Sequence, residues 1–248
     1  MDLQVTTNLA VECNNVGAEL LRLGFLHEAV ETFKQAAEIL YPVSEYFQTN
    51  ALSVFGMPVT WASAPWLTRP DISATTTLGS HRRLSLDQAK AKLFELYASL
   101  PQAKFPRGID NAYIYAEPFP LDYIKQSPKC CCLEAAVIVY NMGAAYLEHG
   151  SDSCLEKAAV LFDMAFSLAF GTGLTLDRAT QVAMASLNNT AHIYHSFGNY
   201  DVSRQYLASL RSLILSLHDT PDMTSLQIRQ NLLLNAMLLE EPRAASAA

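Results

Sequence analysis

Hydrophobic residues recur at intervals of three or four along most of this chain, which is the spacing of one buried face of an α-helix. Short polar or glycine-containing breaks separate these periods, so the helices are expected to pair as antiparallel hairpins. A last amphipathic helix is expected near the end of the chain. The pattern predicts two helices within 2–41, broken at Gly24, and further helices over 133–149, 154–170, 176–197, 200–217 and 223–239.

The hairpin between residues 139 and 165 shows how its two helices are expected to touch. Small residues stand where the helices must come close, and large residues stand one turn away and fill the remaining space. A single hairpin of this kind cannot bury its own apolar face, so we expect several to stack. The small residues are Gly143, Ala158 and Ala165, and the large ones are Tyr146 and Phe162.

The helical pattern lapses between residues 43 and 129, and Pro42 is expected to end the helix before it. Residues 51–61 and 112–120 are β-branched and aromatic with prolines at their ends, which predicts two short edge strands that pair with each other. Residues 86–100 are predicted to be helical, because Ser85 and Gln88 form a capping box. We therefore expect an irregular insert containing short β-strands and one helix.

The spacing of small, aromatic and glycine residues resembles the tetratricopeptide repeat family, whose unit is a 34-residue helical hairpin. None of the copies has the family's tryptophan near the start of its first helix. An asparagine stands two residues before the first matched position of every copy, at Asn15, Asn141 and Asn189. The matched positions are Gly17, Leu20, Gly24, Ala29, Phe33 and Ala36; Gly143, Tyr146, Gly150, Ala158, Phe162 and Ala165; and Ala191, Tyr194, Gly198, Ser203, Leu207 and Leu210.

The resemblance implies an all-α protein in which antiparallel hairpins stack as a short right-handed solenoid. All parts are expected to belong to one structural domain. The expected organisation is a first hairpin over 1–42, an insert over 43–129, two further hairpins and a C-terminal capping helix over 130–239, and a tail over 240–248.

The same resemblance implies a protein–protein interaction scaffold, because the first helices of such stacks line a concave groove that binds peptides or proteins. No lysine or arginine stands at the implied groove positions, so the clamp that grips acidic chaperone tails is not expected. The groove positions carried over from the family are Asn14, Ala18, Tyr140, Ala144, Asn188 and His192.

Two alternatives remain open from the sequence. One is a regulatory or sensor domain, in which the insert covers the groove until a ligand displaces it. The other is an enzyme with a pocket between the insert and the stack. The chain has no nucleophile motif, phosphate-binding loop or dinucleotide fingerprint, so it gives no reason to assert catalysis or to expect a cofactor.

Composition narrows the class of partner and the compartment. Half of the residues are hydrophobic and the net charge is −7, which suits a globular protein and does not suit a nucleic-acid binder. The first residues do not form a secretory signal, and no window is apolar enough to predict a membrane span. Five cysteines, an odd number, argue against a disulfide framework and favour the cytosol or nucleus.

Three short motifs suggest more specific chemistry. Cys130, Cys131 and Cys132 are too close together to share one tetrahedral zinc, so they are interpreted as packed thiols. His192 and His195 lie one helical turn apart without a nearby carboxylate, which favours a surface pair over a metal site. Two arginines precede Ser85, which makes this serine a candidate phosphorylation site as well as a helix cap.

Overall fold

The computed structural model describes residues 3–55, 85–99, 115–123, 131–171 and 177–216, together with Leu232 and Asn235. All regular secondary structure within these residues is helical, which confirms the all-α class. The helices are α1 (Leu3–Arg22), α2 (Leu26–Phe55), α4 (Leu86–Ser99), α5 (Cys132–His149), α6 (Asp152–Gly171), α7 (Asp177–Ser196) and α8 (Tyr200–Ser216).

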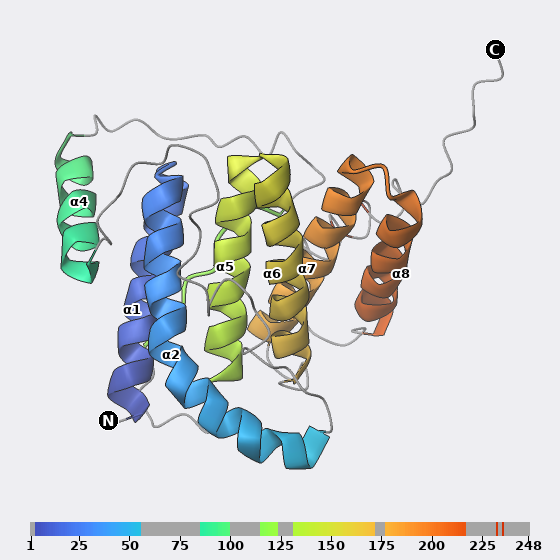
Figure 1. Ribbon diagram of the computed structural model, residues 1–248, viewed down its shortest axis with the longest axis horizontal. Helices are drawn as coiled ribbons and strands as arrows, with labels where there is room; N and C mark the ends of the chain where they lie inside the picture. Colours follow the sequence, from blue (N-terminus) through green and yellow to red (C-terminus); the bar gives the residue numbers. More distant parts are fainter. Residues whose placement is uncertain are drawn as a thin grey trace.

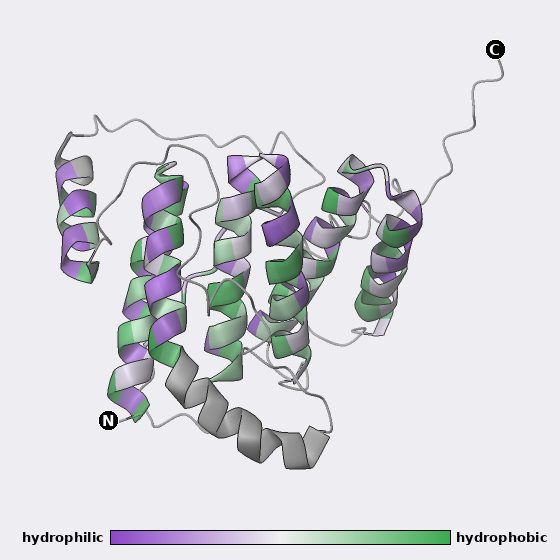
Figure 2. Ribbon diagram, viewed as in Figure 1, coloured by the Kyte–Doolittle hydropathy of each residue, from purple (hydrophilic) through white to green (hydrophobic). Residues whose placement is uncertain are grey.

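Six of these helices form three hairpins that stand side by side in the order of the chain (Figure 1). The hairpins are α1 with α2, α5 with α6, and α7 with α8. The second helix of one hairpin packs on the first helix of the next, so that α2 meets α5 and α6 meets α7. The central hairpin carries much of the apolar sequence (Figure 2), and every residue of α5 from 135 to 145 is buried.

A glycine with a positive φ angle closes each hairpin. The φ angles are 85° at Gly24, 73° at Gly150 and 75° at Gly198. This left-handed conformation lets the chain leave the first helix and turn back. Residues with a Cβ atom rarely adopt it, which explains the glycine at each turn. The three glycines occupy the same position in the sequence repeat, so the repeat correctly located all three turns.

Two further glycines let the helices of a hairpin approach each other closely. A Cβ atom added at Gly17 would lie 2.7 Å from the ring of Phe33, and one added at Gly143 would lie 3.0 Å from the ring of Phe162. Both rings are fully buried and have no room to withdraw. The predicted packing of small residues against aromatic rings is therefore present in the first two hairpins.

Replacing Gly17 by alanine is expected to destabilise the protein by about 2 kcal/mol. The clash with Phe33 outweighs the gain in helix propensity, which is about 1 kcal/mol. Gly171, at the end of α6, is the matched control, because no described atom lies within 4 Å of a Cβ atom added there. Urea unfolding followed by circular dichroism should show Gly171→Ala to be neutral or stabilising, and equal effects at both positions would contradict this account.

Two predictions for the region after the first hairpin are wrong. Helix α2 does not end at Pro42 but continues to Phe55, and residues 51–55 are therefore helical and not part of a strand. A proline inside a helix removes one hydrogen bond and favours a bend, without preventing the following residues from continuing the helix. Residues 56–61 lie outside the described residues.

The helix predicted within the insert is confirmed as α4. Its first turn has the expected capping box, in which the Gln88 N–H donates to Ser85 Oγ at 3.2 Å and the Ser85 N–H donates to Gln88 Oε1 at 2.8 Å. Helix α4 packs beside α1 (Figure 1). An ion pair between Lys90 and Glu12 joins these two helices, and Lys92 pairs with Glu28 of α2.

The second predicted strand is extended but has a different partner. Residues 115–123 form no strand ladder within the described part of the chain. Their pairing with 51–61 is also wrong for the described residues, since 51–55 are helical. The main chain of 115–123 bonds instead to side chains of the helical stack. Most of the predicted C-terminal helix over 223–239 and the whole tail over 240–248 lie outside the described residues.

Candidate peptide-binding face

An extended segment, residues 115–123, lies across the first helices of all three hairpins; we call it the docked segment. One asparagine from each of these helices bonds both the N–H and the C=O of a single segment residue. All six donor–acceptor distances are 2.8 or 2.9 Å. The pairs are Asn189 with Tyr115, Asn141 with Phe119, and Asn15 with Leu121.

Asparagine suits this task because its amide carries a hydrogen-bond donor and an acceptor side by side. An extended residue presents the same two groups on one edge, as it would to a neighbouring β-strand. Asn15, Asn141 and Asn189, which we call the asparagine ladder, occupy one position in the three sequence copies. The ladder therefore holds the main chain of the docked segment and does not depend on its side chains.

The ladder asparagines of the second and third hairpins also bond to the preceding hairpin. Asn141 Nδ2 donates to Asn14 Oδ1 at 2.8 Å, and Asn189 Nδ2 donates to the Tyr140 hydroxyl at 3.3 Å. Asn14 and Tyr140 are the residues immediately before the ladder asparagines of their own helices. These bonds run from hairpin to hairpin and fix the orientation of the amides.

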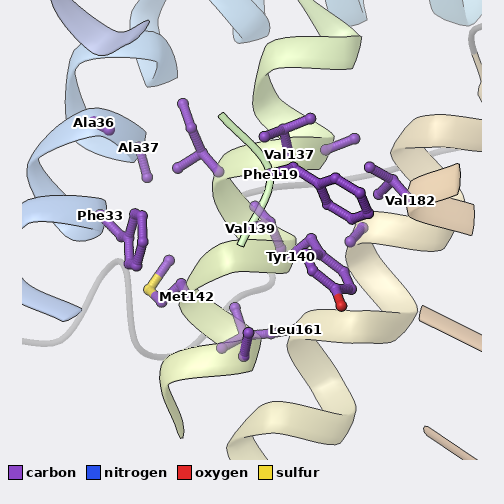
Figure 3. Packing of buried hydrophobic residues seen from close by; sticks show 14 of the residues in the cluster. Phe33, Ala36, Ala37, Phe119, Val137, Val139, Tyr140, Met142, Leu161 and Val182 are labelled. Atoms are coloured by element: carbon purple, nitrogen blue, oxygen red, sulfur yellow. The ribbon is translucent and has the colours of Figure 1, made fainter. Parts of the chain in front are cut away.

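Phe119 anchors the docked segment in the hydrophobic core, where it is 3% exposed. Its ring centroid lies 4.9 Å from that of Tyr140 and 5.4 Å from that of Tyr115. In Figure 3 the Phe119 ring points between Tyr140 of α5 and Val182 of α7. The guanidinium of Arg178 lies 5.7 Å from the Phe119 ring centroid, at cation–π distance.

Prolines on both sides of Phe119 prepare the segment for this geometry. Pro118 is buried, whereas Pro120 is exposed. Neither has an N–H group that would need a partner, and each restricts its own φ angle and favours an extended residue before it. The docked segment therefore loses less conformational freedom than a flexible chain would lose on binding.

The six predicted groove residues differ in their relation to the docked segment. Asn14 Nδ2 donates to the Phe119 carbonyl at 3.2 Å, and the Tyr140 hydroxyl donates to the Tyr115 carbonyl. Ala18 and Ala144 are buried in the core. The two predicted residues of the third hairpin are Asn188, whose Nδ2 donates to Asn189 Oδ1 at 3.2 Å, and His192, which is partly buried.

Sequence reasoning did not assign a role to the asparagine ladder. The signal was visible, because an asparagine recurs at one position of all three copies. It was not used because family analogy placed the groove contacts one residue earlier and three residues later. The docked segment itself carried no sequence signal for its partner.

Burial shifts the pKa values of Tyr140 and His192. It raises the pKa of Tyr140 far above its usual value, so the hydroxyl stays protonated and remains a donor to the Tyr115 carbonyl. Burial and the nearby His195 lower the pKa of His192, which favours the neutral imidazole at pH 7. The hydrogen bond from Tyr140 to the docked segment is therefore insensitive to pH near neutrality.

Glu134, in the first turn of α5, gives a pH-dependent prediction. Burial raises its pKa above 4.5, and one carboxylate oxygen has no hydrogen-bond partner among the described residues. Ionisation of Glu134 is thus less favourable in the folded than in the unfolded chain. Glu134→Gln is expected to stabilise the protein at pH 7, and the gain should shrink as the pH falls from the raised pKa toward 4.5. Urea unfolding at pH 4 and 7 measures this; a gain that grows toward pH 4 would contradict it.

The cysteine, histidine and serine motifs have ordinary structural surroundings. Cys131 is buried, with its sulfur 3.5 Å from Thr7 Oγ1, while Cys130 lies outside the described residues. The His195 ring meets Tyr200 edge-on at 5.0 Å. No cluster of three or more His, Cys, Asp or Glu suited to a metal ion occurs in the described part. Ser85 is exposed and caps α4.

A separate open hollow of about 500 Å³ lies between α6, α7 and α8. Its lining is apolar apart from three serines, and none of the eight lining residues is ionisable. It is therefore a different kind of surface from the face that holds the docked segment. The lining residues are Phe166, Phe170, Leu187, Ala208, Ser209, Ser212, Leu213 and Ser216.

Among the described helices, none has the length and hydrophobicity needed to cross a membrane. No protein-family model, curated protein or solved structure matches this chain.

Proposed function

We propose that this protein is a protein–protein interaction scaffold, in which the face of α1, α5 and α7 binds an extended peptide. The observation that carries the proposal is the asparagine ladder, which bonds the N–H and C=O groups of three residues of an extended chain. Main-chain bonding of this kind supplies affinity, while pockets for alternate side chains supply specificity. The resemblance to tetratricopeptide repeats, with a concave groove in a short solenoid, is part of this proposal, as is action in the cytosol or nucleus.

A second candidate, the regulatory domain, is favoured by the origin of the docked segment. Residues 115–123 belong to the insert between the first and second hairpins, so the chain itself occupies the proposed groove. An occupant tethered within the same chain competes at an effective concentration of about millimolar. In this version the free groove appears only when a partner displaces the docked segment.

The docked segment indicates the peptide class. Its sequence around the anchor is Glu-Pro-Phe-Pro-Leu, with an aromatic ring in the core and a proline on each side. Its N-terminal end lies at α7 and its C-terminal end at α1, which fixes the direction of binding. We therefore infer that partners present an extended Pro-aromatic-Pro-Leu sequence in this direction.

A labelled nine-residue peptide with the sequence of the docked segment tests the proposal. In fluorescence anisotropy, the full chain carrying Phe119→Ala is expected to bind this peptide at least tenfold more tightly than the wild type does. The substitution removes the anchor of the competing segment and leaves the asparagine ladder in place. Adding Asn141→Leu to that variant should abolish binding, because the central main-chain pair is lost.

The outcome that contradicts the proposal is a folded Phe119→Ala variant that binds no peptide at millimolar concentration. Circular dichroism establishes whether the variant is folded. If it is not, Leu121→Ala serves as the second variant, because Leu121 is 9% exposed, belongs to the hydrophobic core cluster and lies where the segment bonds to Asn15 of α1.

A further inference from the structure

Asn235 repeats the hydrogen bond that marks every ladder asparagine after the first hairpin. Asn141 donates to Asn14, and Asn189 donates to the residue before Asn141. Asn235 Nδ2 donates to Asn188 Oδ1 at 3.2 Å, and Asn188 is likewise the residue before a ladder asparagine. The same amide-to-preceding-residue bond thus occurs at three successive steps along the stack.

The apolar surroundings place Asn235 after Asn189 in the row of asparagines that runs along the stacked hairpins. Asn235 and Leu232 are both helical and stand one turn apart. Leu232 is 3% exposed and belongs to a cluster with Leu187 of α7 and Leu207 of α8. Leu232 and Asn235 therefore lie against the third hairpin, as α5 and α7 lie against the hairpins before them.

The Asn235 amide has spare bonding capacity. The side chain is only 4% exposed, and its hydrogen bond to Asn188 uses Nδ2 and not Oδ1. At the other three positions this oxygen accepts the N–H of a docked residue. The described part of the docked segment begins at Tyr115, which pairs with Asn189, the last asparagine of the ladder. Asn235 follows Asn189 along the stack, so it lies beyond the N-terminal end of the described segment.

We propose that Asn235 is a fourth main-chain binding site, which bonds the N–H and C=O of one residue upstream of the position that Tyr115 occupies. This inference rests on the proposed peptide-binding function and extends it, because it assigns the ligand a longer extended stretch at its N-terminal end. Successive ladder pairs are separated by two and by four residues of the docked segment. Four extended residues span about 13 Å, so a six-residue extension is long enough to reach Asn235.

The test compares three synthetic peptides on the full chain carrying Phe119→Ala. The first has the nine-residue sequence of the docked segment. The second adds Ser-Ala-Ser-Ala-Ser-Ala at the N-terminus, and the third adds the same six residues at the C-terminus. Because Asn235 follows Asn189 in the row, only the N-terminal extension should tighten binding, by about tenfold for two additional hydrogen bonds.

Two controls connect that gain to a main-chain contact with Asn235. Asn235→Leu should reduce the ratio of the two dissociation constants, for the nine-residue and N-terminally extended peptides, from about ten to about one. An N-methylated form of the extension lacks the N–H donors but keeps its C=O groups, so it should retain at most about threefold of the tenfold gain. This second control keeps Asn235 itself intact and remains valid if Asn235→Leu does not fold.

Each result supports or overturns the inference. It is overturned if the C-terminal extension, or the N-methylated one, tightens binding as much as the N-terminal extension does. It is also overturned if the nine-residue peptide binds but the N-terminal extension adds nothing. Failure of the nine-residue peptide to bind the folded variant is a distinct result, which removes the proposed function and this site with it.

Discussion

Replacing Asn141 by leucine is expected to lower the free energy of unfolding by about 3 kcal/mol. Asn141 is fully buried and pairs with both the N–H and the C=O of Phe119, and it also donates to Asn14. Leucine has a similar size but bonds to none of these groups, so three buried polar groups lose a partner. Urea unfolding followed by circular dichroism measures the change.

Asn15→Leu is the matched control for this prediction. Asn15 makes the same pair of hydrogen bonds, to Leu121, but it is only partly buried, so water can replace part of what is lost. Its cost is expected to be about half that of Asn141→Leu. Equal costs at the two positions, or a cost below about 1 kcal/mol at Asn141, would show that the ladder contributes little to stability.

Phe119→Ala is expected to cost about 3 kcal/mol, the lower end of the range for a buried phenylalanine. The ring is 3% exposed and packs on two other aromatic rings. In the proposed regulatory mechanism the docked segment detaches from the helices, so no cavity remains in the core and the cost stays at this lower end. The same urea titration measures the loss.

Tyr123→Ala is the control within the same segment. Tyr123 is 57% exposed, so its removal is expected to change the free energy of unfolding by less than about 0.5 kcal/mol. If both substitutions had small effects, the docked segment would not be anchored by Phe119. The proposed way of freeing the groove would then lose its basis.

The helices and their turns could be predicted because the signals that specify them are local. The three- and four-residue hydrophobic spacing located all eight boundaries of α5, α6, α7 and α8 within two residues, and glycine identified the turns that need a positive φ angle. The capping box located the start of α4 because Ser85 and Gln88, three positions apart, bond to each other. Each of these features is decided by residues a few positions apart.

The candidate site could not be predicted in this way. The aromatic and proline-rich sequence around Phe119 correctly indicated an extended chain, but strand propensity cannot identify the partner of that chain. The partners of the docked segment lie 106 residues before it, 22 after it and 74 after it. The prediction that a helix ends at Pro42 was wrong for a related reason. A proline removes one helical hydrogen bond, but it does not determine whether the helix continues after it.

The position of the docked segment in the chain has a consequence for protein synthesis. Tyr115 bonds to Asn189, which is 74 residues further along, whereas the partners of Leu121 have already been made when the segment emerges from the ribosome. Domains begin to fold from the N-terminus during translation. A nascent chain therefore passes through a stage in which α1 is present but α7 does not yet exist, and under the proposed function a competing peptide would meet the least competition from the docked segment at that stage.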